Sequence, residues 1–312
     1  MSGSENGLLS AVRTSRWSTL AWAVPLVAVL AVVVVFGARW LRVQPDVAAW
    51  LETYPGEAPL PAWAPVGIPG WLAWQHFLNV FFLVLIVRTG WQIRTVQRPP
   101  AYWTRSNQGV LRTKAAPKKI PIHQWLHNAL DLLWVLNGVI FVIVLFVTGQ
   151  WARIVPTSWD VLPNALSAAL QYVSFDWPVE DGWANYNALQ QLSYFGVVFV
   201  LAPLAILSGV RLAEFWPAAS KLSGIYRIEW ARAVHFPVML LFVLFTLVHV
   251  ILVFATGAQR NLNHMFAASE DASSWWGVVF FAGGMLLIIA ALTAARPLVI
   301  RSVAAAFGRV GR

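Results

Sequence analysis

Six runs of apolar residues, separated by polar segments rich in proline and glycine, dominate the pattern of this chain. Each run is about 20 residues long, which is the length an α-helix needs to cross a hydrocarbon core of ~30 Å. We therefore expect an all-α membrane protein with six transmembrane helices. They lie at roughly Trp17–Ala38, Trp71–Trp91, His127–Thr148, Ala188–Val210, Ala233–Thr256 and Trp275–Ala295.

The same pattern predicts how the chain is organised. It predicts an N-terminal tail (1–16), an additional helix (17–38), a four-helix core (71–256), a second additional helix (275–295) and a basic tail (296–312). The tail 1–16 lacks the features of a signal peptide, so we expect it to be kept and cytoplasmic. The segment 159–175, between the third and fourth spans, is expected to form a short interfacial helix or a packing lid.

Basic residues fall almost entirely on one side of this topology. Eighteen of the 22 Lys and Arg residues lie at the two termini and in the segments 88–120 and 211–232. The positive-inside rule then places both termini in the cytoplasm of a bacterial inner membrane. This explains most of the net charge of +9, so nucleic acid is not an expected partner. The segment 88–120 is also a candidate docking surface for an acidic partner or anionic lipid.

Histidine is the residue type that suggests chemistry. Cysteine is absent, which excludes disulfides, iron–sulfur ligation and the covalent attachment of c-type haem. His235 and His249 lie fourteen residues apart on one predicted span. Four helical turns separate them, so both side chains share one face, about 21 Å apart along the axis. Such a helix can supply one axial ligand to each of two stacked haems.

Two further histidines match these two in predicted depth. His76 lies near the outer end of its span, as His249 does, and His127 lies at the inner end, as His235 does. Polar residues inside a membrane usually face the bundle interior, where haem ligation or an interhelical hydrogen bond satisfies them. We expect haem iron to be bound by an outer pair, His76 and His249, and an inner pair, His127 and His235.

Two other polar residues leave alternatives open, and a third does not. His123 lies one turn before His127 and is the alternate inner ligand, or contacts a haem propionate or a lipid headgroup. Asp131, one turn after His127, hydrogen-bonds that histidine, carries protons or pairs with a neighbouring Asn or Trp. His264 is expected to be an exposed loop residue.

The segment from Trp71 to Thr256 resembles the cytochrome b (gamma) subunit of respiratory formate dehydrogenase, bacterial cytochrome b561 and the cytochrome b of nickel–iron hydrogenases. The shared features are the His235–His249 spacing, the sequence from Gln75-His76 to Gly90, Leu126-His127, and Tyr186-Asn187-Ala188-Leu189-Gln190. The resemblance implies a four-helix core that holds two b haems. It also implies that Tyr186, Asn187 and Gln190 lie beside a pocket for a quinone, menaquinone or ubiquinone.

This chain departs from the family in two respects. It has one helix before the core and one after it, so the core is expected to be inverted in the membrane. The Tyr-Asn motif then lies at the outer face. The motif also has an interpretation without a ligand, in which Asn187 caps the fourth span and Gln190 closes a capping box.

The function predicted from these features is transmembrane electron transfer between a quinone and a partner redox protein. The chain would be the electron-transfer subunit of a quinone-linked respiratory oxidoreductase, and its partner a catalytic or iron–sulfur subunit. One alternative is a self-contained membrane haem oxidoreductase that acts on superoxide or a ferric chelate. Another is a transporter, which is disfavoured because no internal repeat is visible and the conspicuous polar residues, Asn137 excepted, lie toward the membrane faces rather than the midplane.

Overall fold

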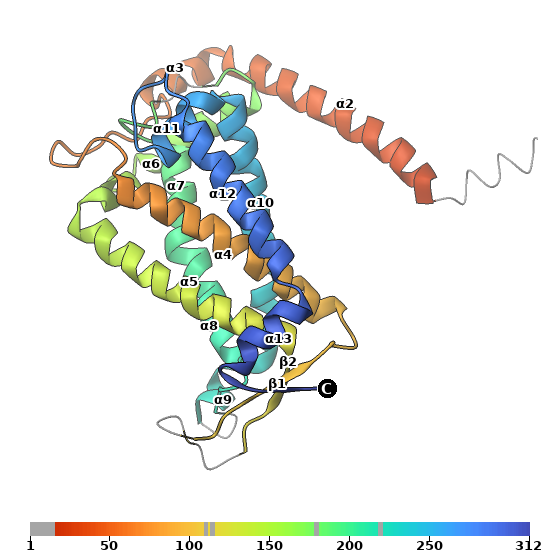
Figure 1. Ribbon diagram of the computed structural model, residues 1–312. Helices are drawn as coiled ribbons and strands as arrows, with labels where there is room; N and C mark the ends of the chain where they lie inside the picture. The colour runs from red at the N-terminus through yellow and green to blue at the C-terminus, as the bar shows by residue number, and fades with distance from the viewer. Residues whose placement is uncertain (1–15, 109–111, 113–115, 178–180, 218–220) are drawn as a thin grey trace, which may run out of the picture. The chain divides into compact units, whose positions relative to one another are not determined.

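The structure is a computed structural model that describes residues 16–108, 112, 116–177, 181–217 and 221–312 (Figure 1). Within this part of the chain six helices are long and apolar enough to cross a membrane, as the sequence predicts. They are α2 (Arg16–Arg42), α4 (Gly70–Thr95), α5 (Ile122–Val147), α7 (Ala188–Phe195) continued by α8 (Ala202–Leu212), α10 (Ile228–Ala255) and α12 (Trp276–Ala294). The predicted fold class, an all-α membrane protein with six spans, is confirmed.

Several spans extend beyond their apolar windows. The fifth, α10, begins at Ile228 rather than Ala233, because the polar residues Glu229 and Arg232 continue the helix past the predicted hydrocarbon boundary. The fourth is interrupted by a π-helical turn at Gly196–Leu201. This wider turn ends two residues before Pro203, which lacks the N–H that a regular α-helix would need at that position.

Shorter helices connect the spans, and one follows the last span. They are α3 (Pro45–Thr53), α6 (Val161–Val173), α9 (Lys221–Ile225), α11 (Ala258–Phe266) and α13 (Pro297–Ala305). The expected short helix in the segment 159–175 is therefore present as α6. The segment that contains His264 was expected to be a loop but forms α11, which was not predicted because it is short and strongly polar on one face.

The chain divides into two compact units. Of the described residues, the first contains those in 1–59, 156–180 and 186–192, and the second contains those in 60–155, 181–185 and 193–312. In the first unit, the small core of Ala58, Val161, Ala165 and Ala188 packs beneath Leu189 and Leu192. Arg42 Nη1 forms an ion pair with Asp176 at 2.6 Å in the same unit.

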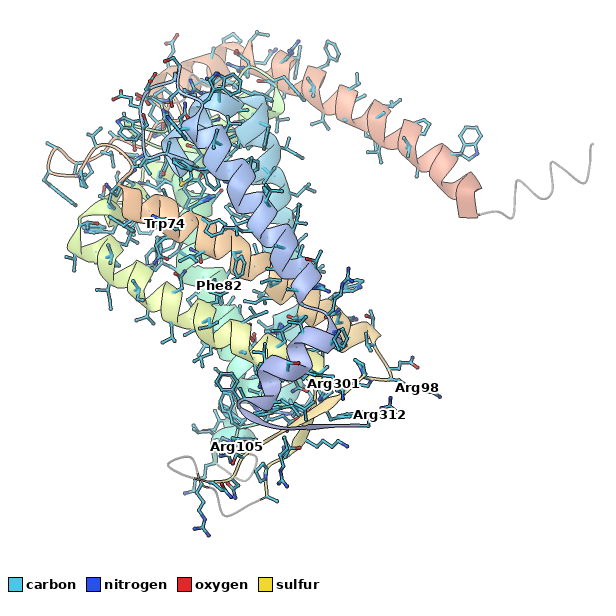
Figure 2. All side chains as sticks on the ribbon, viewed as in Figure 1. Trp74, Phe82, Arg98, Arg105, Arg301 and Arg312 are labelled. Carbon is cyan, nitrogen blue, oxygen red and sulfur yellow. The ribbon has the colours of Figure 1, made fainter. Side chains whose placement is uncertain are left out.

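The second unit contains the predicted histidines. In it α4 packs against α5, α8 packs against α10, and α12 packs against α4 and α11. Phe82 and Leu85 of α4 and Leu130 of α5 form a buried cluster between these helices. Figure 2 labels Phe82 on α4. The opposite face of α5 leaves Leu132, Leu136 and other large apolar side chains exposed. That face suits contact with lipid, because helices in a bilayer associate through close packing rather than through burial of apolar area.

A small sheet closes one end of the second unit. The strands β1 (Tyr102–Arg105), β2 (Lys119–Pro121) and β3 (Gly308–Gly311) pair antiparallel in the order β2-β1-β3. A Cβ atom at Gly308 would lie 2.5 Å from the Thr104 carbonyl oxygen, so only glycine fits there. The sheet was not predicted, because three- and four-residue strands carry too little periodicity to be recognised. It joins the C-terminal segment to the basic segment after α4.

Candidate functional site

The structure brings the four predicted ligand histidines together as two pairs. The ring centres of His127 and His235 are 6.4 Å apart, and those of His76 and His249 are 6.2 Å apart. These are the partners expected from matching depths in the sequence. The helix α10 contributes one histidine to each pair, α4 contributes His76 and α5 contributes His127.

Both separations fit an iron atom held between two imidazoles. A transition metal binds an imidazole nitrogen at about 2.0 Å, and the ring centre lies about 1 Å beyond the nitrogen. Two such ligands on opposite sides of one iron therefore place their ring centres about 6 Å apart. Among the described residues, no group of three or more His, Cys, Asp or Glu converges as a metal site. The histidines thus occur as pairs, the number of protein ligands that a bis-imidazole haem needs.

The first pair is bound by hydroxyl groups, and we call His127 and His235 the hydroxyl-bonded pair. Thr89 Oγ1 lies 2.9 Å from His127 Nδ1, and Ser208 Oγ lies 2.9 Å from His235 Nδ1. Each hydroxyl also donates to the carbonyl four residues earlier in its own helix, at Leu85 and Leu204.

Those bonds determine the direction of the hydrogen bond to each ring. A hydroxyl has one proton, and here that proton is directed to the backbone. The hydroxyl oxygen therefore accepts from the ring, so Nδ1 carries the ring proton and Nε2 carries the lone pair. Nε2 is then the nitrogen able to bind a metal in both His127 and His235.

A glycine follows each of these hydroxyl residues. A Cβ atom at Gly90 would lie 3.3 Å from His127 Cε1, and one at Gly209 would lie 3.3 Å from His235 Cε1. The two rings therefore pack directly on helix backbone. The dipeptides Thr89-Gly90 and Ser208-Gly209 thus give each ring a hydroxyl oxygen as acceptor and a glycine without a side chain to pack against.

Asp131 is close to the same pair. Its Oδ2 atom lies 3.5 Å from His127 Nε2, one turn further along α5. With the ring proton on Nδ1, the two facing atoms are both acceptors, an arrangement that a cation or an added proton between them would stabilise. Asp131 therefore lies beside His127 without a direct hydrogen bond between these two atoms, and the choice among its three interpretations stays a prediction.

The second pair has aromatic neighbours, and we call His76 and His249 the aromatic pair. His249 stacks on Phe245 at a ring-centre distance of 5.6 Å and meets the edge of Tyr194 at 6.1 Å. Phe266 of α11 contacts His76 at 5.5 Å. The Nδ1 atom of His76 is buried and has no hydrogen-bond partner within the described part of the chain.

Aromatic side chains occupy the space halfway between the two pairs. Phe242 is buried and lies seven residues from His235 and seven from His249 on α10. Trp134 of α5 packs against Phe242 at 6.2 Å, and its Nε1 donates to Asn79 Oδ1 at 3.1 Å. The indole ring is thus held in one orientation between the pairs.

The other two histidines have different environments. His123 is buried at the start of α5, and its Nδ1 has no hydrogen-bond partner among the described residues. His264 was expected to be exposed, and this prediction is wrong because α11 folds it inward until only 5% of its surface is accessible. Burial lowers the pKa of His264, and the positive charges of Arg260 and Arg153 act in the same direction, while Asp181 and Glu270 oppose it.

The Tyr-Asn motif lies in the first unit. Asn187 Oδ1 accepts from Gln190 N at 2.9 Å, and Gln190 Oε1 accepts from Asn187 N at 3.0 Å. This is the reciprocal capping box that the sequence offered as an interpretation without a ligand. Asn187 Nδ2 also donates to the Tyr172 hydroxyl at 2.9 Å. Tyr186 directly precedes the cap.

A hollow that sequence reasoning missed lies in the second unit. It has a volume of about 350 Å³ and is lined by Pro65–Pro69, Trp71, Thr148, Gln150 and Trp183. Gln150 is buried, its Nε2 donates to the Gly67 carbonyl, and its Oε1 has no partner within the described residues. No local signal could have revealed this hollow, because its walls come from three segments far apart in the sequence.

The end of the second unit that carries the sheet is basic. Figure 2 shows Arg98, Arg105, Arg301 and Arg312 around the strands, away from Trp74 and Phe82 of α4. The hydroxyl-bonded pair is nearer to this end, because α5 starts directly after β2 and reaches His127 within two turns. The aromatic pair is nearer to α11.

One curated protein is similar to much of this chain. It is a putative protein-methionine-sulfoxide reductase subunit YedZ1 from Azospira oryzae, 29% identical over 201 residues, which cover 59% of this chain and 88% of that protein. No protein-family model matches the chain, and no solved structure matches it. The six spans and this similarity agree on a multi-pass membrane protein related to a subunit of a reductase. They leave the choice among the cytochrome b families named above a prediction.

Proposed function

We propose that this protein carries electrons across a membrane between a quinone and a partner redox subunit, through two b-type haems. The observation that carries the proposal is the geometry of the two histidine pairs. Their ring centres are 6.2 and 6.4 Å apart, and α10 separates them by fourteen residues, about 21 Å. When bound, the haems would supply one-electron carriers at both ends of this span.

The residues of the chain hold and orient these groups. His127 and His235 would ligate one haem through Nε2, with Thr89 and Ser208 holding the rings. His76 and His249 would ligate the other. Trp134 and Phe242 place packed aromatic groups between the pairs.

The quinone is the second part of the proposal. Oxidation of a quinol releases two electrons and two protons, and reduction of a quinone takes up the same number. The resemblance to formate dehydrogenase cytochrome b supports Tyr186, Asn187 and Gln190 as the headgroup site. The hollow at Gln150 is a rival position, because its lining includes Trp71 and Trp183 and holds a buried amide oxygen able to accept from a quinol hydroxyl. Quinol-driven haem reduction that fails in Gln150→Leu but survives in Gln190→Leu would select the hollow.

The partner is proposed to be a catalytic or iron–sulfur subunit. The similar protein is named as a subunit of a putative methionine-sulfoxide reductase, which supports a subunit role with a redox partner. The basic end of the second unit is the proposed docking surface, and the hydroxyl-bonded pair is the closer of the two pairs to it. A self-contained oxidoreductase is the alternative, and purification without any accompanying subunit would favour it.

Both termini are proposed to be cytoplasmic in a bacterial inner membrane. Each of the four cations on the other side has structural partners. Arg42 pairs with Asp176, Arg39 donates to the Ser174 carbonyl, Arg153 donates to four backbone carbonyls, and Arg260 donates to the Thr256 carbonyl. The chain has no cysteine, so Ser106→Cys and Ala272→Cys would report sidedness. An impermeant maleimide applied to intact cells should label the second variant and not the first.

The experiment that tests the haem proposal is a reduced-minus-oxidised absorbance spectrum of the purified protein. A pyridine haemochrome assay on the same sample gives the ratio of haem to protein. Two b haems per chain support the proposal. Absence of haem would overturn it and bring forward a transporter, with the histidines as packing or proton-relay groups.

A further inference from the structure

The two histidine pairs differ in what holds the ring nitrogen that faces away from the metal position. In the hydroxyl-bonded pair, both Nδ1 atoms have a hydroxyl oxygen at 2.9 Å. In the aromatic pair, His76 Nδ1 is buried without a hydrogen-bond partner among the described residues. The neighbours of that pair are the rings of Phe266, Phe245 and Tyr194.

The two hydroxyl groups have equivalent surroundings. Each belongs to a residue that precedes a close-packed glycine, Gly90 or Gly209. The backbone carbonyls of Ile86 and Ala205, each three residues before a hydroxyl, also accept from that hydroxyl, at 3.0 and 3.2 Å. A carbonyl can only accept, so these contacts direct both hydroxyl protons to the backbone and support the assignment of the ring proton to Nδ1 in both histidines.

We infer that Thr89 and Ser208 are positioning residues that make the hydroxyl-bonded pair the stronger electron donor to its haem iron. This inference rests on the proposed function. An imidazole that donates its second N–H becomes a more basic ligand, and a more basic axial ligand stabilises ferric over ferrous iron. The hydroxyl-bonded pair then holds the haem of lower reduction potential, and the aromatic pair holds the haem of higher potential.

The asymmetry has a consequence for electron flow. With other influences equal, an electron that enters at the basic end of the second unit moves from the lower-potential to the higher-potential haem. If the Nδ1 atoms of both pairs had the same hydrogen-bond partners, this effect would give no preferred direction of electron transfer. The hydroxyl groups therefore bias transfer from the hydroxyl-bonded pair toward the aromatic pair.

The test is a redox titration of the purified protein with its haems bound. Thr89→Val and Ser208→Ala remove one hydroxyl each at small change in volume. Each should raise the potential of one haem and leave the other unchanged. At the wild-type midpoint, the ratio of reduced to oxidised haem should rise by up to about tenfold, equivalent to 59 mV for a one-electron couple. The ferric EPR g values of the same haem should shift with it.

Conservative variants distinguish the hydrogen bond from packing. Thr89→Ser and Ser208→Thr keep the hydroxyl and should keep both the potential and the g values. Thr246→Val is the matched control, because the Thr246 hydroxyl lies in the same bundle and donates to the Phe242 carbonyl at 2.8 Å. It should change neither haem. A His76→Ala background, which leaves the hydroxyl-bonded pair alone, identifies the haem that moves.

The possible results separate this inference from the proposed function. Wild-type protein without haem would overturn the proposed function and with it this inference. Two haems whose potentials and g values are unchanged in both hydroxyl-deleted variants would overturn the inference alone. So would equal shifts in Thr89→Ser and Thr89→Val, because a role in packing alone predicts that result. If Thr89→Val loses haem, the smaller change Ser208→Ala and the Thr89→Ser variant still decide the question.

Discussion

The hydroxyl-bonded pair and the aromatic pair show two ways of placing a histidine inside a helical bundle. Thr89 and Ser208 hold the first pair from within the spans, as residues of α4 and α8 whose hydroxyl groups are bonded to their own helices. The second pair depends on α11, which carries Phe266 against His76. The ring positions in the hydroxyl-bonded pair therefore depend on how the spans pack against one another. The ring positions in the aromatic pair also depend on α11, a connecting segment outside the spans.

The largest expected effect comes from removal of a paired histidine. His127→Ala and His76→Ala should each lower bound haem from two per chain to one, because a bis-imidazole site loses half of its axial ligands. The pyridine haemochrome assay measures this ratio. His123→Ala is the matched control on α5 and should retain both haems. Loss of haem in His123→Ala with retention in His127→Ala would instead make His123 the ligand.

Loss of the hydrogen bonds that hold α11 in place should weaken haem binding at the aromatic pair selectively. Asn263 is fully buried, accepts from Gly277 N at 2.8 Å and donates to the carbonyls of Asp271 and Ser274. Asn263→Ala leaves those backbone groups unpaired and should cost about 3 kcal/mol. On heating, absorbance reports the temperature at which each haem is lost. In Asn263→Ala this temperature should fall for the haem at the aromatic pair and stay unchanged for the other haem.

Gln259→Ala supplies the control for this experiment. Its side chain also joins α11 to the Ser273 and Ser274 carbonyls but is partly exposed, so its removal should cost well under 1 kcal/mol. Equal losses at both haems in Asn263→Ala would show that α11 does not distinguish the pairs.

A smaller effect is expected at the glycine beside the hydroxyl-bonded pair. Gly90→Ala places a methyl group 3.3 Å from His127 Cε1 and should destabilise that site by about 1–3 kcal/mol. Gly138→Ala on α5 meets no atom within 4 Å and should be neutral, or stabilising by up to about 1 kcal/mol. Thermal midpoints of the two variants, compared with wild type, check the contrast. Similar midpoints for both variants would mean that the ring does not lie against Gly90.

The charge of Asp131 should produce an effect of about 3 kcal/mol. The carboxylate lies 3.5 Å from His127 Nε2 and favours the more positive, ferric state of a haem bound there. Asp131→Asn should therefore raise that potential by roughly 140 mV, for charges about 5 Å apart and an effective dielectric constant of about 20. A redox titration measures the shift. An equal shift at both haems would contradict a local effect.

The smallest expected effect is a pH dependence at His264. Burial lowers its pKa from 6.5 in the folded protein, so below about pH 6.5 the unfolded chain binds more protons than the folded one. Stability should then be full above that pH and fall as the solution becomes more acidic. His264→Gln should flatten the fall in the thermal midpoint between pH 7 and pH 5. An unchanged slope would assign the dependence to other groups.

Local patterns were sufficient for much of the molecule. Runs of apolar residues identified the six spans, and the capping box at Asn187 and Gln190 was recognisable from its spacing. The pairing of His127 with His235, and of His76 with His249, followed from equal depth on helices of known direction. These features depend on helix geometry, in which residue number along a span converts directly to depth.

Other features were decided only by tertiary structure. The partners of His127 and His235, the inward position of His264, the hollow at Gln150 and the sheet of β1, β2 and β3 all join residues that are distant in the sequence. Sequence by itself determined the depth of each side chain along its own helix. Only the packed structure decided which face of each helix meets which neighbour, because rotation about the helix axis depends on side-chain contacts between helices.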